Sequence, residues 1–427
     1  MRKTLSVVAL VVMLCILLTA CGAQPYACTD PLGCVTVKDG AGIKIGSLLT
    51  MTGPDSAYGI DALRGVEIAI ADRKGVSGHP VELVKLDDLC TAEGGTQGAT
   101  QFAGNPDITG VVGTTCSSAT IPAAEILTKA SMVLISPSST APSLTDPATH
   151  QASFLRTIYD DETQGRVVAE FAFIILGSHR MLTVHDGSAY PKQLQQAAST
   201  YFETLGGNCV MRIDLSDGQD MKTALDAAAD LDPDVIYFPL YTEDGVTLVK
   251  AIPEAGFSDP ALISSDGLFS SDFIEKAGRL TEGMYISSPA VVKDSADFAA
   301  KYKSRYGEDP IASYRLQAYD AAMMLFPQSK RWPFPCRQRA TAFRSLASRC
   351  ATPCMPHTGC RASAGRSTAP YLEIAPDPIS KSFRSSIRRS NRSIPEALRV
   401  LRMCYSWGDL TASRWYFIRS RLAVRAP

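Results

Sequence analysis

From residue 43 onward, short apolar runs alternate with longer stretches whose apolar residues recur at helical spacing, and this alternation constrains the fold most strongly. A first series has predicted strands at residues 43–49, 81–86, 108–113 and 132–135 and helices at residues 58–74 and 121–130. A second series has helices at residues 165–176, 193–205, 221–229 and 245–255 and strands at residues 181–185, 210–215, 235–239 and 261–264. Repeated βα units predict parallel sheets covered by helices, and two series predict an α/β chain with two lobes.

Ligands of such sheets bind beyond the carboxyl ends of the strands, so the loops that follow them are the candidate site. In the first series, the loop 113–120 is rich in Ser and Thr and includes Ser117, and the loop 135–142 includes Ser138 and Thr140. These hydroxyls can simply cap helices. A helix N-terminus also offers free N–H groups and a positive dipole end, and two such loops on neighbouring strands favour a seat for a small anion.

The loops of the second series carry Tyr190, Tyr241 and Asp266. Each is ordinary alone, as a Tyr beside a cleft or an Asp in a turn with Gly. Together, aromatic walls and a carboxylate can enclose an ammonium group. Opposite an anion seat, they predict a site for a zwitterion.

Several motifs along residues 43–326 now support a family resemblance. The matching segments are residues 52–54 with 58–59, 86–90, 116–118, 136–142, 155–157 and 319–321. In these segments the chain resembles the substrate-binding proteins of branched-chain amino acid ABC transporters, the Leu/Ile/Val-binding group of type I periplasmic binding proteins. The resemblance implies two Rossmann-like lobes with parallel sheets, joined at a hinge, and no enzymatic reaction or cofactor.

The resemblance also assigns roles to individual residues. It implies that Ser117 and Thr140, with backbone groups near Ser138, hold the ligand carboxylate. It implies that Asp266 holds the ammonium group and that the aromatic residues Tyr58, Tyr190 and Tyr241 shape the cleft. The chain departs from the family pattern in that Asp266 is shorter than the usual Glu and Ser138 stands where Ala is common, and both changes could move the preference away from plain leucine.

Cysteine placement agrees with an exported protein. The resemblance implies a disulfide between Cys90 and Cys116. Cys28 and Cys34 are close enough for a small disulfide loop in an oxidising environment, with two free thiols as the alternative, and Cys209 has no obvious partner.

The N-terminus has the layout of a secretory signal. Arg2 and Lys3 precede an apolar run at residues 5–18, and the residues up to Cys21 resemble a bacterial lipobox. We therefore predict a lipoprotein signal peptide at residues 1–20, a lipid anchor on Cys21 and a spacer at residues 21–42. An uncleaved membrane anchor is the alternative, and both place the rest of the chain outside the cytoplasm, in the periplasm or on the outer face of the plasma membrane.

The composition changes abruptly after Phe326. Residues 1–326 hold 23 Lys+Arg and 39 Asp+Glu, a balance of −16, whereas residues 327–427 hold 19 Lys+Arg and 4 Asp+Glu, a balance of +15. This tail has 17 Arg but two Lys, and all three Trp. An anion-binding tail would not exclude Lys, so we predict a frameshift near Phe326 and a disordered tail. Cys350, Cys354, His357 and Cys360 have loosely zinc-like spacing, which in such a tail predicts no metal site.

The predicted organisation is an N-terminal lobe at residues 43–160, a second lobe at residues 161–289 and a return to the first lobe at residues 290–326. We place crossovers near Asp160 and Pro289 and expect a third beyond Phe326, so the final elements of both lobes are missing. No tail segment is predicted to replace them, and we therefore expect the chain as written to be poorly stable or inactive.

The leading functional prediction is a solute receptor that closes on an amino acid and delivers it to permease subunits in the membrane. A ligand-sensing domain for amino acids or small amides in signalling, or an inactive frameshifted remnant, are the alternatives. No G-x-S-x-G, G-x-G-x-x-G or P-loop motif is present, which argues against an enzyme. A nucleic-acid partner would rest on the tail alone and is not predicted.

Overall fold

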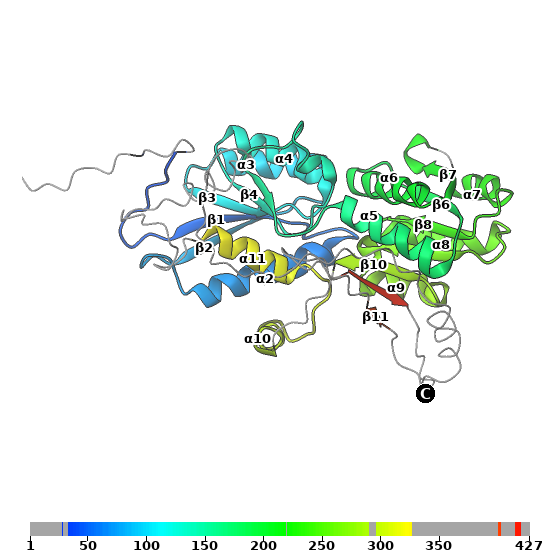
Figure 1. Cartoon of the computed structure of the whole chain (residues 1–427). Coiled ribbons are helices and arrows are strands. Elements are labelled where there is room, and N and C mark those ends of the chain that lie inside the picture. Colours follow the sequence, from blue (N-terminus) through cyan, green and yellow to red (C-terminus); the bar gives the residue numbers. More distant parts are fainter. Residues whose placement is uncertain are drawn as a thin grey trace, which may run out of the picture.

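The computed structural model describes residue 28 and residues 33–218, 220–289, 296–326, 400–402 and 415–419. These residues form two lobes, each built on its own sheet (Figure 1). The predicted signal peptide, the lipidation site Cys21 and the zinc-like cluster in the tail lie outside the described residues.

The N-terminal lobe, or N-lobe, is a parallel sheet of five strands in the order β2-β1-β3-β4-β5. The strands are β1 (Ile43–Leu48), β2 (Val81–Leu86), β3 (Ile108–Gly113), β4 (Leu134–Ser136) and β5 (Phe154–Arg156). The helices are α2 (Ser56–Arg73), α3 (Ala92–Ala103) and α4 (Ser117–Lys129), with a short 3-10 turn at Pro142–Leu144. This arrangement confirms the parallel α/β prediction, with β2 and β3 at the predicted bounds.

The second lobe, or C-lobe, repeats the plan with five parallel strands in the order β10-β9-β8-β6-β7. The strands are β6 (Arg180–His185), β7 (Asn208–Asp214), β8 (Val235–Phe238), β9 (Ala261–Ser265) and β10 (Tyr285–Pro289). The helices are α5 (Asp161–Glu170, continued by a π-helical stretch at Phe171–Leu176), α6 (Ala189–Thr204), α7 (Met221–Ala229), α8 (Thr242–Ala251) and α9 (Ser271–Ala277). Short 3-10 turns occur at Leu215–Asp217, Ile252–Glu254, Asp266–Leu268 and Gly278–Thr281.

The chain returns to the N-lobe through α10 (Ala296–Tyr306) and α11 (Arg315–Leu325), both of which pack against α2. The buried carboxylate of Asp61, on α2, connects the returning segment to the N-lobe. Its Oδ2 accepts the backbone N–H groups of Tyr314 and Arg315 at 2.9 Å each, and its Oδ1 accepts the Tyr302 hydroxyl at 3.2 Å. Because an unpaired buried carboxylate is costly, these bonds fix the returning segment on α2.

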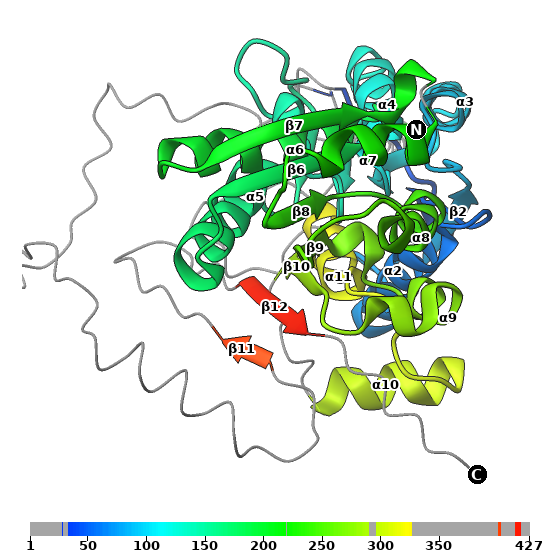
Figure 2. The ribbon, with the colours of Figure 1, turned by 90° about the vertical axis from the view of Figure 1, so that its right-hand side faces the viewer.

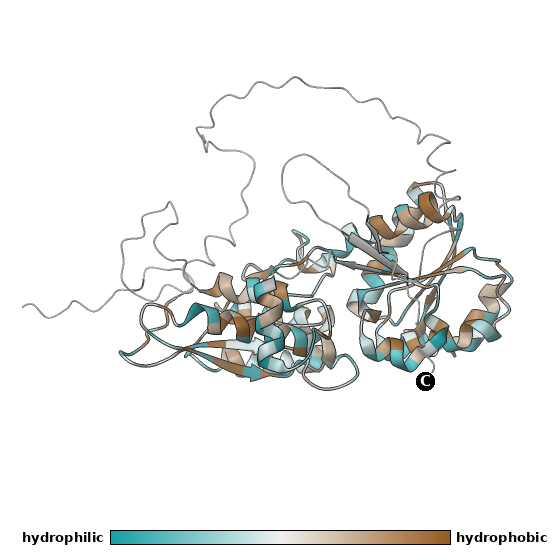
Figure 3. Ribbon diagram, turned by 90° about the horizontal axis from the view of Figure 1, so that it is seen from below, coloured by the Kyte–Doolittle hydropathy of each residue, from teal (hydrophilic) through white to brown (hydrophobic). Residues whose placement is uncertain are grey.

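Apolar strands form the cores of both lobes. All six residues of β3 and all four of β8 are buried. Apolar residues of the flanking helices close over the strands, and Figure 3 shows the helices striped with hydrophobic and hydrophilic residues. Burial of this apolar surface, at about 25 cal/mol per Å², is the main stabilising contribution.

Helix α3 was not predicted, because Gly94, Gly95 and Gly98 lower its intrinsic helix propensity. The structure explains these glycines. A Cβ on Gly95 would collide with the backbone of Ala119 in α4, and one on Gly98 would collide with Leu48. Close packing between α3 and α4 therefore requires residues that a propensity argument counts against a helix.

Two tail segments are strands, which corrects the prediction of a wholly disordered tail with no replacement strand. β12 (Trp415–Arg419) pairs antiparallel with all of β10, and β11 (Val400–Arg402) pairs with β12 (Figure 2). The aromatic and β-branched residues of β12 favour a strand, and β10 would otherwise end the sheet as an unpaired edge. Because β12 covers this edge, the exposed edge from which poor stability or inactivity was expected is not present, whereas the proposed frameshift near Phe326 remains a prediction about the gene.

Candidate functional site

The N-lobe side of the site is formed by the loops after β3 and β4. Ser117 begins α4, and its Oγ accepts the backbone N–H of Ala141 at 3.2 Å. Ser138 Oγ donates to the Thr115 carbonyl at 2.7 Å, which ties the second loop to the first. The first N–H groups of α4 have no partner within the helix, so this side presents hydroxyls and N–H donors to a small anion.

Asp88 supports these loops from behind. It is fully buried, and its Oδ2 accepts the backbone N–H of Thr115 at 2.7 Å, while its Oδ1 accepts the hydroxyl of Thr50 at 2.5 Å and the N–H of Cys90 at 3.0 Å. Burial raises the pKa of the Asp88 carboxyl to about 6, although the hydrogen bonds that the carboxylate accepts act to lower it. The predicted Cys90–Cys116 disulfide is present and joins the two loops covalently.

The structure also shows the state of Cys28, Cys34 and Cys209. Cys28 and Cys34 form the disulfide that the spacer sequence left open. Cys209 is a free, buried thiol, and burial raises its pKa. Its sulfur lies 3.7 Å from the Met211 carbonyl, away from the site.

The C-lobe side carries the acidic group. Asp266 begins the 3-10 turn after β9 and is 3% exposed. Its Oδ1 accepts the Tyr190 hydroxyl at 2.8 Å and the Gln164 side-chain amide at 2.7 Å, and its Oδ2 accepts the Tyr314 hydroxyl at 2.5 Å. A carboxylate has about four lone-pair sites, so these donors leave one direction on Oδ2 for a further donor.

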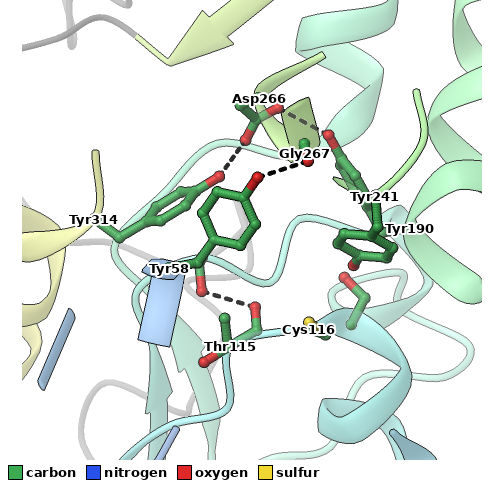
Figure 4. Close-up of a pocket in the computed structure, with 10 residues that line it drawn as sticks. Tyr58, Thr115, Cys116, Tyr190, Tyr241, Asp266, Gly267 and Tyr314 are labelled. Carbon is green, nitrogen blue, oxygen red and sulfur yellow. Dashed lines mark hydrogen bonds between the residues drawn. The ribbon is translucent and has the colours of Figure 1, made fainter. Parts of the chain in front are cut away.

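Tyrosines from both lobes surround this carboxylate. Tyr190 and Tyr241, from the C-lobe, have ring centroids 5.6 Å apart. Tyr58 and Tyr314, from the N-lobe, meet edge to face at 5.9 Å. Figure 4 shows the Tyr58 and Tyr314 hydroxyls pointing toward Gly267 and Asp266, with Thr115 and Cys116 on the opposite side of the cavity.

Between the two sides lies a small cavity, whose empty space of about 320 Å³ includes its open mouth. It is lined by Tyr58, Thr115, Cys116, Ser117, Ser138, Tyr190, Tyr241, Asp266, Gly267 and Tyr314. Six of the seven residues predicted for ligand binding are therefore brought together, and they come from both lobes.

Thr140 is the predicted ligand residue that does not line the cavity. It is buried behind the wall, its Oγ1 has no hydrogen-bond partner among the described residues, and its carbonyl accepts the N–H of Asp161 at 3.0 Å. Its predicted contact with the ligand carboxylate thus stays a prediction.

Asp161 was missed by the sequence argument. It opens α5 just after the first crossover, is fully buried, and neither carboxylate oxygen has a hydrogen-bond partner within the described ranges. Burial raises its pKa well above the usual range, and the nearby Asp266 charge acts in the same direction while the Arg156 charge opposes it. A buried unpaired acid of this kind is costly unless it meets a proton or a cation.

Tyr314 was also missed, as were the lining residues Thr115 and Gly267. Tyr314 lies in the returning segment just before α11, not in a loop after a strand, so the strand-end rule gave no signal for it. Thr115 and Gly267 lie inside loops that were singled out, and each contributes backbone groups beside a predicted residue.

The site shows no arrangement for nucleophilic catalysis among the residues that the structure describes. His185, at the end of β6, accepts the Gly187 N–H at 3.0 Å, and burial lowers its pKa. No cluster of His, Cys, Asp and Glu able to hold a metal ion occurs in the part of the chain that the structure describes. The residues that line the cavity offer hydroxyl and N–H donors on one side and a carboxylate on the other, which suits the binding of a small charged ligand.

Comparisons with known proteins agree with this geometry. Residues 42–327 match the family described as Periplasmic binding protein. An amino acid binding protein of Pseudomonas aeruginosa is 26% identical over 294 residues, 67% of this chain and 77% of that protein. The Leu/Ile/Val-binding protein of Escherichia coli is 28% identical over 251 residues, 58% of this chain and 67% of that protein.

A solved structure shows the same likeness. The leucine binding protein of Thermotoga maritima superimposes with a TM-score of 0.60 at 27% identity, covering 66% of this chain and 81% of that one. The resemblance inferred from the sequence motifs is thereby confirmed, as are the two-lobed fold and the expectation of a binding protein instead of an enzyme.

Proposed function

This chain belongs to the periplasmic binding protein family, and we propose that it is the amino-acid receptor of an ABC transporter. In this proposal it binds a branched-chain or related amino acid between the lobes and delivers it to the permease. The relatives named for Leu, Ile and Val binding support this choice of ligand.

One observation carries the proposal: a donor-rich loop pair and a carboxylate face each other across one small cavity. Ser117 and Ser138 lie with the N-terminus of α4 on one side, and Asp266 lies on the other. An α-amino acid carries an anion and a cation on neighbouring atoms, and the two sides would hold them separately.

Asp161 extends the proposed cation seat. It is fully buried, and neither of its side-chain oxygens has a hydrogen-bond partner among the described residues. A ligand ammonium has three donor hydrogens. We propose that the ammonium group donates to the open direction of Asp266 Oδ2 and to the carboxylate of Asp161.

Titration calorimetry tests the proposal on the full chain, after bound ligand has been removed by unfolding and refolding. L-leucine, L-isoleucine and L-valine should bind with a 1:1 stoichiometry. D-leucine serves as the control, because it cannot place carboxylate, ammonium and side chain together. Failure of all three L-amino acids to bind a folded sample would contradict the proposed ligand class.

The anchor is a separate part of the proposal. No helix among the described residues is long and apolar enough to cross a membrane. We propose that the protein is held at the membrane by a lipid on Cys21 after removal of residues 1–20. Mass spectrometry of the membrane fraction should find a mature N-terminal peptide with the mass of a diacylated cysteine, and Cys21→Ala should abolish it. An unmodified peptide that starts at Met1 would contradict the anchor.

A further inference from the structure

Two tyrosines of the N-lobe reach across the cavity to the same turn of the C-lobe. Tyr58 donates to the carbonyl of Gly267 at 2.7 Å, and Tyr314 donates to Asp266 Oδ2 at 2.5 Å. We propose that these tyrosines and the Asp266–Leu268 turn form a clasp that stabilises the closed arrangement of the lobes independently of the ligand, with Tyr314 as a positioning residue for Asp266.

The clasp has a rigid base. Tyr58 and Asp61 both lie on α2, and Asp61 Oδ2 accepts the backbone N–H groups of Tyr314 and Arg315. Two segments more than 250 residues apart, one carrying each tyrosine, are thus joined through one buried carboxylate. The tyrosines are 3% and 6% exposed, so their hydroxyls bond in an environment that excludes most water. Hydrogen bonds there are stronger than at the surface.

The two bonds of the clasp do different work. The bond to Gly267 joins neutral groups, whereas the bond to Asp266 joins a hydroxyl to a carboxylate, and charge-assisted bonds are the stronger kind. The Tyr314 bond also fixes the orientation of Asp266 from the opposite lobe. Asp266 is therefore fully positioned only when the lobes are closed. Both bonds run from protein to protein, so their contribution to closure needs no ligand.

Backbone amides elsewhere in the cleft can report this closure. The N–H of Ala189, the first residue of α6, donates to Ser118 Oγ across the cleft at 3.1 Å. The N–H of Ser143 donates to Gln193 Oε1 across the cleft at 3.0 Å. The first N–H groups of a helix have no partner inside it, so protection of these amides depends on the closed arrangement.

Hydrogen–deuterium exchange of the ligand-free full chain, read by mass spectrometry at single-residue resolution, tests the clasp. Tyr314→Phe should speed exchange at Ala189 and Ser143 about tenfold, Tyr58→Phe less, and the double variant most. Tyr319→Phe is the matched control, because its hydroxyl donates to Asp72 within the N-lobe at 3.3 Å. That control should leave both amides unchanged.

Unchanged exchange at Ala189 and Ser143 in the double variant would overturn the clasp. So would equal acceleration at the buried amide of Val111 in β3, which would show local unfolding in place of opening. If Tyr314→Phe does not fold, Tyr58→Phe carries the test alone, with an expected acceleration of about threefold. No ligand is present, so these results are independent of the proposed amino-acid specificity.

Discussion

The two sides of the cavity share a strand–loop–helix plan but present opposite chemistry. The N-lobe side offers hydroxyls and the N-terminus of α4, whereas the C-lobe side offers a buried carboxylate among tyrosines. The carboxyl edge of a parallel sheet therefore does not set the charge that it binds. The residues of the loops set it, and two similar sheets can hold the two ends of one zwitterion.

The two sides also differ in how they are supported. The N-lobe loops are held within their own lobe by Asp88 and the Cys90–Cys116 disulfide. Asp266 is held by Tyr190 and Gln164 from its own lobe and by Tyr314 from the other. We therefore expect changes to the N-lobe supports, Asp88 and the disulfide, to affect mainly stability, and changes to Asp266 to affect mainly ligand affinity.

The largest effect is expected from Asp266→Ala. A ligand ammonium would lose the carboxylate that it bonds most directly, which costs about 2–5 kcal/mol of binding free energy. L-leucine affinity measured by calorimetry should therefore fall at least thirtyfold. Asp272→Ala, an exposed acid nearby in sequence on α9, is the control and should bind as the parent does. Parental affinity in Asp266→Ala would remove Asp266 from the site.

A smaller effect, on stability, is expected from Asp88→Asn. The amide replaces one acceptor oxygen with a donor that faces N–H or O–H groups, so the free energy of unfolding should drop by about 2 kcal/mol. Urea denaturation followed by circular dichroism measures this. Asp107→Asn breaks only an exposed ion pair with Lys44 and should cost under about 0.5 kcal/mol. Equal losses in the two variants would contradict the supporting role of Asp88.

A pH effect is expected from Asp55, whose Oδ1 accepts the Thr242 N–H across the cleft at 3.4 Å. Burial raises the pKa of this carboxyl to about 6, with Asp186 and Glu243 acting in the same direction. In an open cleft Asp55 would return toward its ordinary value of 3.8. Closure therefore takes up a proton. Closure is favoured most below pH 3.8, and this advantage is lost as the pH rises through about 6.

Ligand affinity should accordingly fall about tenfold between pH 4.5 and pH 7. The groups that face Asp55 are Tyr58, Thr242, Tyr241, Glu243 and Asp186. Calorimetry across this range should show the decline in the parent and a flatter profile in Asp55→Asn. An identical slope in both would assign the pH dependence to another group.

The smallest effect is expected from Ser117→Ala. Removing one hydroxyl from the anion side leaves the helix N–H groups in place, so L-leucine affinity should fall about fivefold. Leucinamide, which lacks the carboxylate, should lose nothing. A larger loss for leucinamide than for leucine would place Ser117 with the wrong end of the ligand.

The sequence predicted the regular elements well where apolar periodicity decides them. β2, β3 and α7 have the predicted bounds, because their side chains alone fix burial and period. Helix α3 was not predicted because its glycines allow close packing, of Gly95 against α4 and of Gly98 against Leu48, and local helix propensity does not include such tertiary contacts. Strand β12 was not predicted because its strand-forming residues are a short stretch within a tail dominated by Arg, Ser and Pro.

The sequence predicted those site residues that lie in loops after the ends of strands. Ser117, Ser138, Tyr190, Tyr241 and Asp266 all lie in such loops and all line the cavity. Asp161 and Tyr314 lie instead where the chain passes between lobes or returns to one. Their positions depend on how the two lobes meet, and only the three-dimensional arrangement contains that information.

The central claim is that the two lobes hold opposite ends of one zwitterion. Calorimetry of the parent and Asp266→Ala, each with L-leucine and with 4-methylpentanoate, tests it most directly, because the second probe is leucine without its amino group. The account predicts that Asp266→Ala weakens L-leucine at least thirtyfold and leaves 4-methylpentanoate within about twofold of the parent. Equal weakening of both probes would contradict it, because Asp266 would then act on something other than the ammonium group.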